Sequence, residues 1–133
     1  MGARVTRSKP REITIEGVSK LHGTHYTIMP DRNEEVTFAI AAAITQGDII
    51  VRNSQRWALA AFLAKFKEAG AKYDVIDETT TRYYCEGRAK ATDVVTLPYP
   101  GFMTDWQAPW AIFMTQASGV STIHETVFES RFS

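Results

Sequence analysis

The chain has 133 residues, with 15 Lys or Arg and 15 Asp or Glu, so its formal net charge is zero. A chain of this length fits one domain whose core needs no disulfide or metal to hold it together. Because neither charge sign forms a long run, the sequence argues against a general nucleic-acid or membrane-surface binder. The single cysteine, Cys85, excludes an internal disulfide framework, and no segment resembles a signal peptide or a spanning helix. We therefore expect a soluble, cytoplasmic protein.

The segment before residue 30 predicts strands only. Residues 4–8 and 12–17 alternate apolar and polar side chains, which is typical of two strands of a hairpin. Residues 24–29 predict a further strand. His22 and His25 have no companion cluster of ligands nearby in the sequence, so we expect no metal site.

The next segment predicts a capped, buried helix. Asp31, with Glu34 three residues later, resembles a capping box, in which side chains satisfy the free N–H groups of a helix start. Residues 38–44 are apolar on every side of a helix, which is typical of a buried helix, and Gly47 ends the run.

The remaining elements alternate between strands and helices. Residues 48–53, 93–97 and 120–126 predict short strands, and 72–76 with 81–85 predict a second hairpin. Two more helices are expected. The first is amphipathic, with apolar side chains at helical spacing at Leu59, Phe62, Leu63 and Phe66, and the second follows Thr104-Asp105.

Four short motifs occur twice in the same order. The offsets are 68, 70, 74 and 72 residues for Gly2-Ala3 with Gly70-Ala71, Glu16-Gly17 with Glu86-Gly87, Pro30-Asp31 with Thr104-Asp105, and Gly47 with Gly119. Such spacing predicts a repeated unit of about 70 residues. In each copy an aspartate stands where an apolar helix begins, and we expect the function at those helix starts.

The repeat divides the chain into three parts. Residues 1–23 would be the closing hairpin of one unit, 24–88 a complete βαβαββ unit and 89–133 the first half of the next. We expect these parts to form a single compact region over 1–133, with the first hairpin packed beside the half unit. Because the outer units are incomplete, we also expect the chain to be a segment of a longer protein.

Five ordered motifs together resemble one family, the UDP-N-acetylglucosamine 1-carboxyvinyltransferases of bacterial peptidoglycan synthesis. They are residues 27–32, 37–44, 97–102, 104–108 and 125–132. The resemblance implies an α/β fold with mixed sheets, built from repeated βαβαββ units of the inside-out α/β barrel type, of which about two are present here. It also implies an enzyme of two lobes with the active site between them, and a chain that crosses between lobes near Met29-Pro30. The reaction would move the enolpyruvyl group of phosphoenolpyruvate onto the 3-hydroxyl of UDP-N-acetylglucosamine, without a cofactor.

The same resemblance implies the site residues. Asp105 matches the family aspartate assigned as general base for the sugar hydroxyl, which needs a positioned carboxylate to become a good nucleophile. Val127 matches a position that touches the sugar nucleotide, and Arg131 an arginine suited to anionic substrates. Asp31 is expected at the cleft in the preceding unit. Without the resemblance, the simpler interpretation of an aspartate at a helix start is a helix cap, whose carboxylate accepts from free backbone N–H groups.

The chain departs from the family pattern at several positions, and parts of the family site lie outside it. Asn33 and Val36 replace an aliphatic residue and glycine, Met103 and Trp106 replace proline and methionine, and Ser130 replaces asparagine. The family's loop cysteine, its phosphoenolpyruvate-binding lysine and several arginines have no counterpart here. We therefore expect a chain that is inactive alone, and that needs the missing lobe segments or self-associates. Two alternatives stay open: an enzyme like 3-phosphoshikimate 1-carboxyvinyltransferase, and a non-catalytic binding or assembly module.

Overall fold

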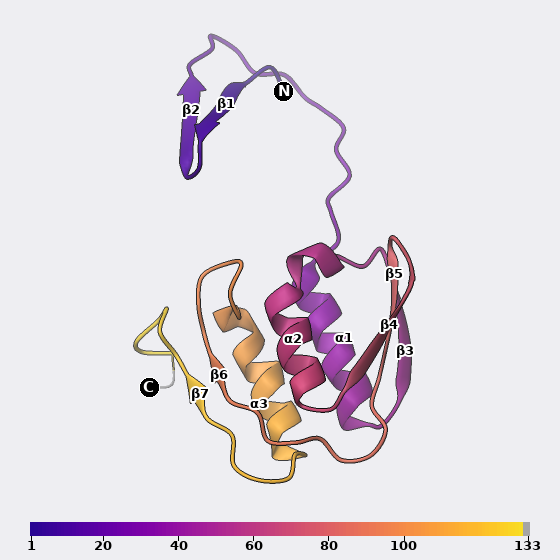
Figure 1. The fold of residues 1–133 in the computed structure, drawn as a ribbon. Helices are drawn as coiled ribbons and strands as arrows, with labels where there is room; N and C mark the ends of the chain where they lie inside the picture. The colour runs from indigo at the N-terminus through magenta and orange to yellow at the C-terminus, as the bar shows by residue number, and fades with distance from the viewer. Residues whose placement is uncertain (132–133) are drawn as a thin grey trace.

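The computed structural model describes residues 1–131 as a bundle of helices beside a small sheet, with a hairpin set apart from both (Figure 1). Within these residues, no helix combines the length and apolar character needed to cross a membrane. The elements, with η for a 3-10 turn, are β1 (Arg4–Lys9), β2 (Glu12–Glu16), α1 (Arg32–Ile44), β3 (Asp48–Arg52), η1 (Arg56–Ala58), α2 (Ala60–Glu68), β4 (Lys72–Asp77), β5 (Thr80–Tyr84), β6 (Val94–Val95), η2 (Thr104–Trp106), α3 (Gln107–Thr115) and β7 (Ile123–His124).

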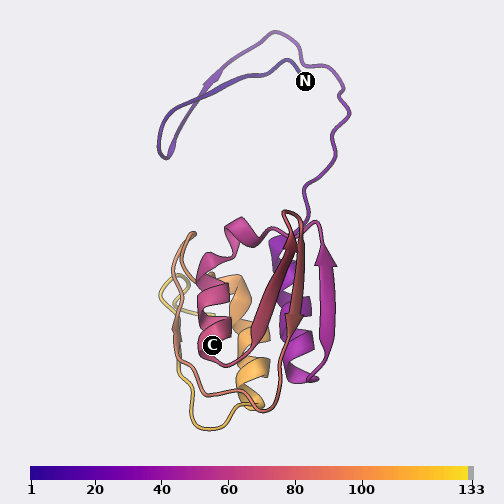
Figure 2. The same cartoon turned by 45° about the vertical axis from the view of Figure 1, so that its right-hand side comes forward.

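The structure combines helices with strands, as the predicted α/β fold class requires, but each sheet of the described residues is wholly antiparallel or wholly parallel and none is mixed. β3, β5 and β4 form an antiparallel sheet in that order, in which Ile49 lies opposite Tyr83 and Tyr83 opposite Tyr73. β6 and β7 pair in parallel on the other side of the helices (Figure 2). The predicted strands at 48–53, 72–76 and 81–85 are confirmed, whereas those at 93–97 and 120–126 shorten to two residues each.

Aromatic side chains from α2, η2 and α3 form the centre of the core. Phe62 lies edge-on to Trp106 and Trp110, with ring centroids 6.0 and 6.3 Å apart, and Phe113 packs against Trp110 at 5.5 Å. α1 presents small residues to this cluster, with Ala39, Ala42 and Ala43 buried. The amphipathic pattern of α2 is confirmed. α1 is less completely buried than its apolar run predicts, since Phe38 is 54% exposed.

Residues 1–30 do not join this core. β1 and β2 are exposed along their whole length, and an extended linker connects them to α1 (Figures 1 and 2). The compact part of the structure therefore begins near Asp31, which differs from the expectation of one compact region over 1–133 and of a hairpin packed beside the half unit. The chain leaves the body near Met29-Pro30, where the resemblance places the crossing between lobes.

The predicted strand at 24–29 is wrong for this structure, in which the segment is extended but unpaired. A strand needs a neighbour to satisfy its backbone N–H and C=O groups. β3 lies at the edge of its sheet, yet the linker leads away from that edge. The segment remains exposed, including Tyr26, Ile28 and Met29.

Local geometry supports the repeat. Both hairpins are antiparallel, and each follows a glycine in the left-handed region, Gly2 with φ of 83° and Gly70 with φ of 91°. Glycine has no β-carbon and adopts this backbone region at little cost, so it suits this position in both copies. Further features recur about 70 residues apart: the ion pairs Arg4–Glu16 and Lys72–Glu86, and the backbone bonds from His22 to Met1 and from Lys90 to Ala69.

Candidate functional site

The turn η2 holds Asp105 at the surface because the residues on either side of it are buried. Trp106 is 1% exposed and packs its ring edge-on to Phe102, with centroids 5.4 Å apart. Thr104 is also buried, and its hydroxyl donates to the carboxylate of Glu125 at 2.7 Å. With both neighbours fixed inward, the Asp105 side chain stays half exposed and accessible to a ligand.

Arg131 approaches Asp105 from the C-terminal loop. Its Nη2 lies 3.4 Å from Asp105 Oδ1, and the two side chains are 38% and 49% exposed. Charge-assisted bonds of this type are usually 2.7–2.9 Å long, so this contact is a loose one. Exposure and salt screening also keep such pairs weak. The guanidinium can therefore turn toward an anionic ligand without a large loss of free energy.

Glu125 connects the loop of Val127 and Arg131 to η2. The Glu125 carboxylate accepts from the backbone N–H groups of Val127 at 2.5 Å and Phe128 at 2.9 Å, in addition to the Thr104 hydroxyl. The half-buried Val127 is thereby held beside the turn that carries Asp105. The structure thus brings together three residues that the sequence predicts for one site: Asp105, Val127 and Arg131.

Asp31 lies at the start of α1, where it has the role of a helix cap. Its Oδ1 accepts from the backbone N–H of Asn33 at 2.8 Å, one residue earlier than in the expected capping box with Glu34. The Asn33 side chain in turn accepts from the indole N–H of Trp106 at 3.0 Å. The first turn of α1 is therefore joined to η2, although Asp31 and Asp105 form no hydrogen bond with each other in the described structure.

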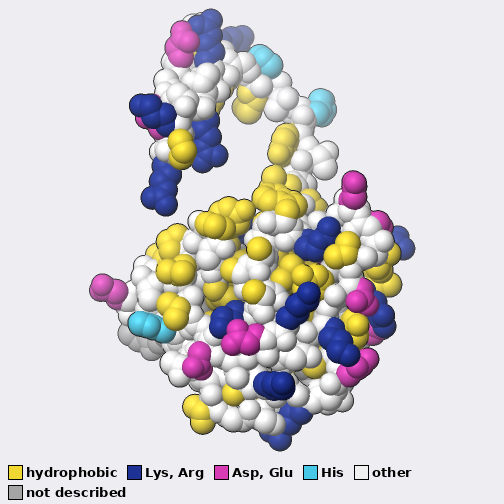
Figure 3. All heavy atoms as spheres, in the orientation of Figure 1, with side chains coloured by type: hydrophobic (Ala, Val, Ile, Leu, Met, Phe, Trp, Pro, Cys, Tyr) yellow, Lys and Arg dark blue, Asp and Glu magenta, His cyan; other side chains and the backbone are white. Residues whose placement is uncertain are grey.

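Three features near the site could not be read from motifs. Arg32 lies 4.8 Å above the ring of Tyr99, a cation–π arrangement that places a second cation at this end of the structure. Glu125 belongs to the motif 125–132, but the motif does not reveal its bond to Thr104, 21 residues away in the chain. Beside Asp31, an open hollow of about 380 Å³ includes Met29 and Trp57 in its lining. Figure 3 shows hydrophobic side chains gathered on the surface of the body that faces the hairpin.

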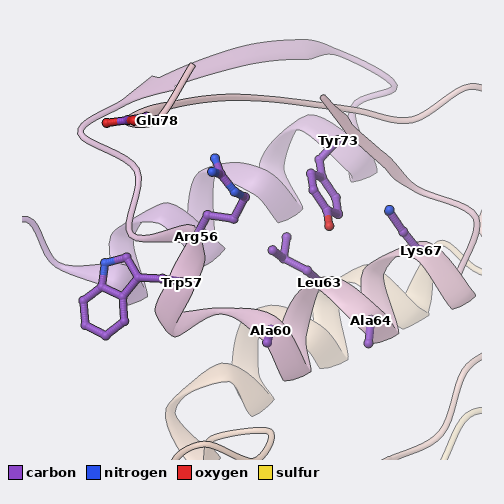
Figure 4. Close-up of a pocket in the computed structure, with 8 residues that line it drawn as sticks. All are labelled: Arg56, Trp57, Ala60, Leu63, Ala64, Lys67, Tyr73 and Glu78. Atoms are coloured by element: carbon purple, nitrogen blue, oxygen red, sulfur yellow. The ribbon is translucent and has the colours of Figure 1, made fainter. Parts of the chain in front are cut away.

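A second hollow, of about 700 Å³, lies away from Asp105 between α2 and β4 (Figure 4). Arg56, Leu63 and Tyr73 point toward it, while Trp57 points away. Lys67 lies 4.4 Å from the centre of the Tyr73 ring. None of the residues predicted for the site lines this hollow, so the described structure separates it from the Asp105 cluster.

The described residues contain no cluster of three or more His, Cys, Asp or Glu side chains arranged to hold a metal ion. Cys85 is buried next to the second hairpin, and this burial raises the pKa of its thiol. A thiol with a raised pKa is a poor nucleophile, because the reactive form is the thiolate. Cys85 therefore has the environment of a structural residue.

Comparisons with known proteins give the family. A sequence model of the family described as EPSP synthase (3-phosphoshikimate 1-carboxyvinyltransferase) matches residues 1–133. The chain is 46% identical over 132 residues to the UDP-N-acetylglucosamine 1-carboxyvinyltransferase of Magnetococcus marinus, and 45% identical over 133 residues to that of Finegoldia magna. These matches cover 99% of the chain but 32% and 31% of the relatives. The chain therefore spans about a third of the length of the curated relatives it matches.

A solved structure agrees on the fold. The enolpyruvyl transferase NikO from Streptomyces tendae superposes with a TM-score of 0.78 over 98% of this chain and 32% of that one. The sequence identity in this comparison is 24%, so the likeness supports the fold and not the substrate.

Proposed function

Because the chain belongs to the EPSP synthase family, we propose that it forms part of a UDP-N-acetylglucosamine 1-carboxyvinyltransferase. The observation that carries the proposal is the identity of 44–46% over nearly the whole chain to curated enzymes of that name. The full enzyme would transfer enolpyruvyl from phosphoenolpyruvate to UDP-N-acetylglucosamine, a step that supplies cell-wall synthesis in the cytoplasm.

In the proposed reaction, Asp105 takes the proton of the sugar 3-hydroxyl. The hydroxyl oxygen forms a bond to the enol carbon of phosphoenolpyruvate, and the bond from that carbon to the phosphate oxygen breaks, so that phosphate leaves. A base positioned in this way contributes typically 10²–10⁴-fold in rate. Half exposure of Asp105 supports the assignment, since its carboxylate is open to a ligand and not committed to a cap.

The other residues would bind the substrates. Arg131 would exchange its loose contact with Asp105 for an anionic group of the substrate, which leaves the carboxylate free to accept the proton. Val127 would offer an apolar contact to the sugar nucleotide. Asp31 would border the same end of the cleft, where α1 begins, but its capping bond to Asn33 gives it a structural role as well.

Two other functions remain as alternatives. The name of the family model favours an enzyme that acts on shikimate 3-phosphate, whereas the curated relatives favour the sugar nucleotide. A non-catalytic assembly module is favoured by the exposed apolar residues of the hairpin and linker, which include Ile15, Leu21 and Ile28. Self-association, or binding of missing lobe segments, would cover these side chains.

A chimera separates the proposed function from the shikimate alternative. Residues 1–133 would replace the matching third of the Magnetococcus marinus relative, and phosphate release would be measured with phosphoenolpyruvate and each acceptor in turn. We expect release with UDP-N-acetylglucosamine. A chimera with an unchanged unfolding transition that releases phosphate only with shikimate 3-phosphate, or with neither acceptor, would contradict the proposal.

A further inference from the structure

Glu125 accepts four hydrogen bonds, an unusual number for a side chain on a surface loop. Its Oε1 accepts from the Thr96 hydroxyl at 2.9 Å and from the backbone N–H groups of Val127 and Phe128. Its Oε2 accepts from the Thr104 hydroxyl at 2.7 Å. Both carboxylate oxygens therefore accept hydrogen bonds, with three donors at Oε1 and one at Oε2.

These four donors come from three separate segments. Thr96 follows β6, Thr104 begins η2, and Val127 and Phe128 belong to the loop after β7. A single carboxylate thus joins the strand pair, the turn that carries Asp105 and the loop that carries Arg131.

The surroundings of Glu125 make this bridge stiff. The Thr126 N–H donates to the Thr96 hydroxyl at 2.9 Å, and the Thr126 hydroxyl donates back to the Thr96 carbonyl at 2.5 Å. The buried Gln107 donates its side-chain N–H to the Thr104 hydroxyl at 3.2 Å, which fixes the direction in which that hydroxyl donates. The two hydroxyls that donate to Glu125, those of Thr96 and Thr104, are therefore themselves fixed by further hydrogen bonds.

We propose that Glu125 is a positioning residue, which sets the place of the Val127–Arg131 loop relative to Asp105. This inference rests on the proposed function, because the geometry it maintains is that of the proposed site. In this role Glu125 would act through Val127, Arg131 and Thr104 and would not itself contact the sugar or the enolpyruvyl group.

The charge state supports this role. Burial by itself would raise the pKa of Glu125, but hydrogen bonds from Thr104, Phe128, Val127 and Thr96 outweigh it and lower the pKa to about 2. Glu125 therefore stays ionised throughout the neutral range. An ionised carboxylate accepts stronger hydrogen bonds than a neutral one, so the bridge persists wherever the enzyme would work.

The test uses the chimera with the Magnetococcus marinus relative. Glu125→Ala removes all four bonds, Thr104→Val removes one at nearly constant volume, and Glu129→Gln is a matched control on the same loop. Displacement of catalytic groups by about 1 Å can cost about 10²-fold in rate, so we expect Glu125→Ala to lower kcat/KM by that order. Thr104→Val should cost less, and Glu129→Gln should cost nothing. Because Glu125 does not take the proton, the fall in rate at low pH should keep the same midpoint in Glu125→Ala.

A second measurement on the 133-residue chain keeps the inference independent of folding failures in the chimera. Amide exchange at Val127 and Phe128 should accelerate in Glu125→Ala, while exchange in α1 and α3 stays unchanged. Unchanged kcat/KM in an active chimera, or unchanged exchange at these two amides, would overturn the positioning role and leave the proposed function standing. A folded but inactive parent chimera would overturn both, although the exchange result would still show whether the bridge exists.

Discussion

The indole N–H of Trp106 donates to the side-chain oxygen of Asn33 across 3.0 Å, and this bond joins the turn of Asp105 to the first turn of α1. The resemblance to the family implies methionine in place of Trp106 and an aliphatic residue in place of Asn33, so both residues depart from the expected pattern. Two apolar side chains would meet here through packing alone. The two departures therefore belong together, because each supplies the hydrogen-bond partner that the other requires.

Breaking this pair should destabilise the chain. Asn33→Leu leaves the indole N–H of the buried Trp106 without a partner, and an unsatisfied buried donor costs about 1–3 kcal/mol. Urea unfolding of the chain would measure the loss. The double variant Asn33→Leu/Trp106→Met restores the family pattern and should lose less than the sum of the two single variants. Additive losses would show that the bond contributes no coupling.

A buried network at the start of α1 gives a second stability prediction. Glu35 is 4% exposed and accepts from the Ser54 hydroxyl at 2.5 Å, the Gln55 N–H at 2.6 Å and the Tyr83 hydroxyl at 2.6 Å. Burial and the bond to Glu35 raise the pKa of Tyr83, so the hydroxyl keeps its proton as donor. Tyr83→Phe should lower the free energy of unfolding by about 1.5–3 kcal/mol, as for other bonds to charged groups. The exposed variant Tyr26→Phe is the control, and equal stability of both variants would contradict the network.

The lowered pKa of Glu125 predicts how the loop responds to acid. The folded pKa of about 2 lies below the value near 4.3 of an unperturbed glutamate. The stabilisation is therefore complete above the unperturbed value, and it is lost as the pH falls through about 2. NMR titration should show the amide signals of Val127 and Phe128 shifting at the acid end of this range. A midpoint near the unperturbed value would mean that the four hydrogen bonds do not hold the carboxylate.

The exposed hairpin predicts self-association of the isolated chain. Val5 lies opposite Ile15 in the hairpin, and Ile13 is on the same strand as Ile15, each more than half exposed. Exposed apolar side chains gathered in this way favour contact with another surface. Light scattering should therefore detect oligomers, which Ile13→Lys/Ile15→Lys should reduce, whereas Ile50→Lys in β3 serves as a comparison. A monomer in the unchanged chain would remove the assembly alternative.

Local patterns were sufficient to predict most of the elements. The amphipathic spacing in α2 reflects which side chains face the core, and the two strands of the second hairpin, β4 and β5, appear where they were expected. The strand at 24–29 was wrong because pairing depends on a neighbour, and sequence alternation alone does not provide one. The expected packing of the hairpin against the half unit failed for the same reason, because no described residue packs on the apolar side chains of β1 and β2.

The candidate site was only partly predictable. Asp105, Val127 and Arg131 were identified by motif, and the structure brings them together, but their roles remain proposals. The bridge through Glu125 and the bond from Trp106 to Asn33 were not predicted. Both join residues 21 or more positions apart in the chain, and such contacts follow from tertiary packing.

Asp105→Asn in the chimera tests whether Asp105 removes the proton from the sugar hydroxyl. The amide keeps the size of the side chain but does not accept a proton, so phosphate release should fall by about 10²–10⁴-fold. Glu78→Gln, at an exposed carboxylate in the turn between β4 and β5, controls for the loss of a charge. Phosphate release from Asp105→Asn at the rate of the unchanged chimera would show that Asp105 is not the base.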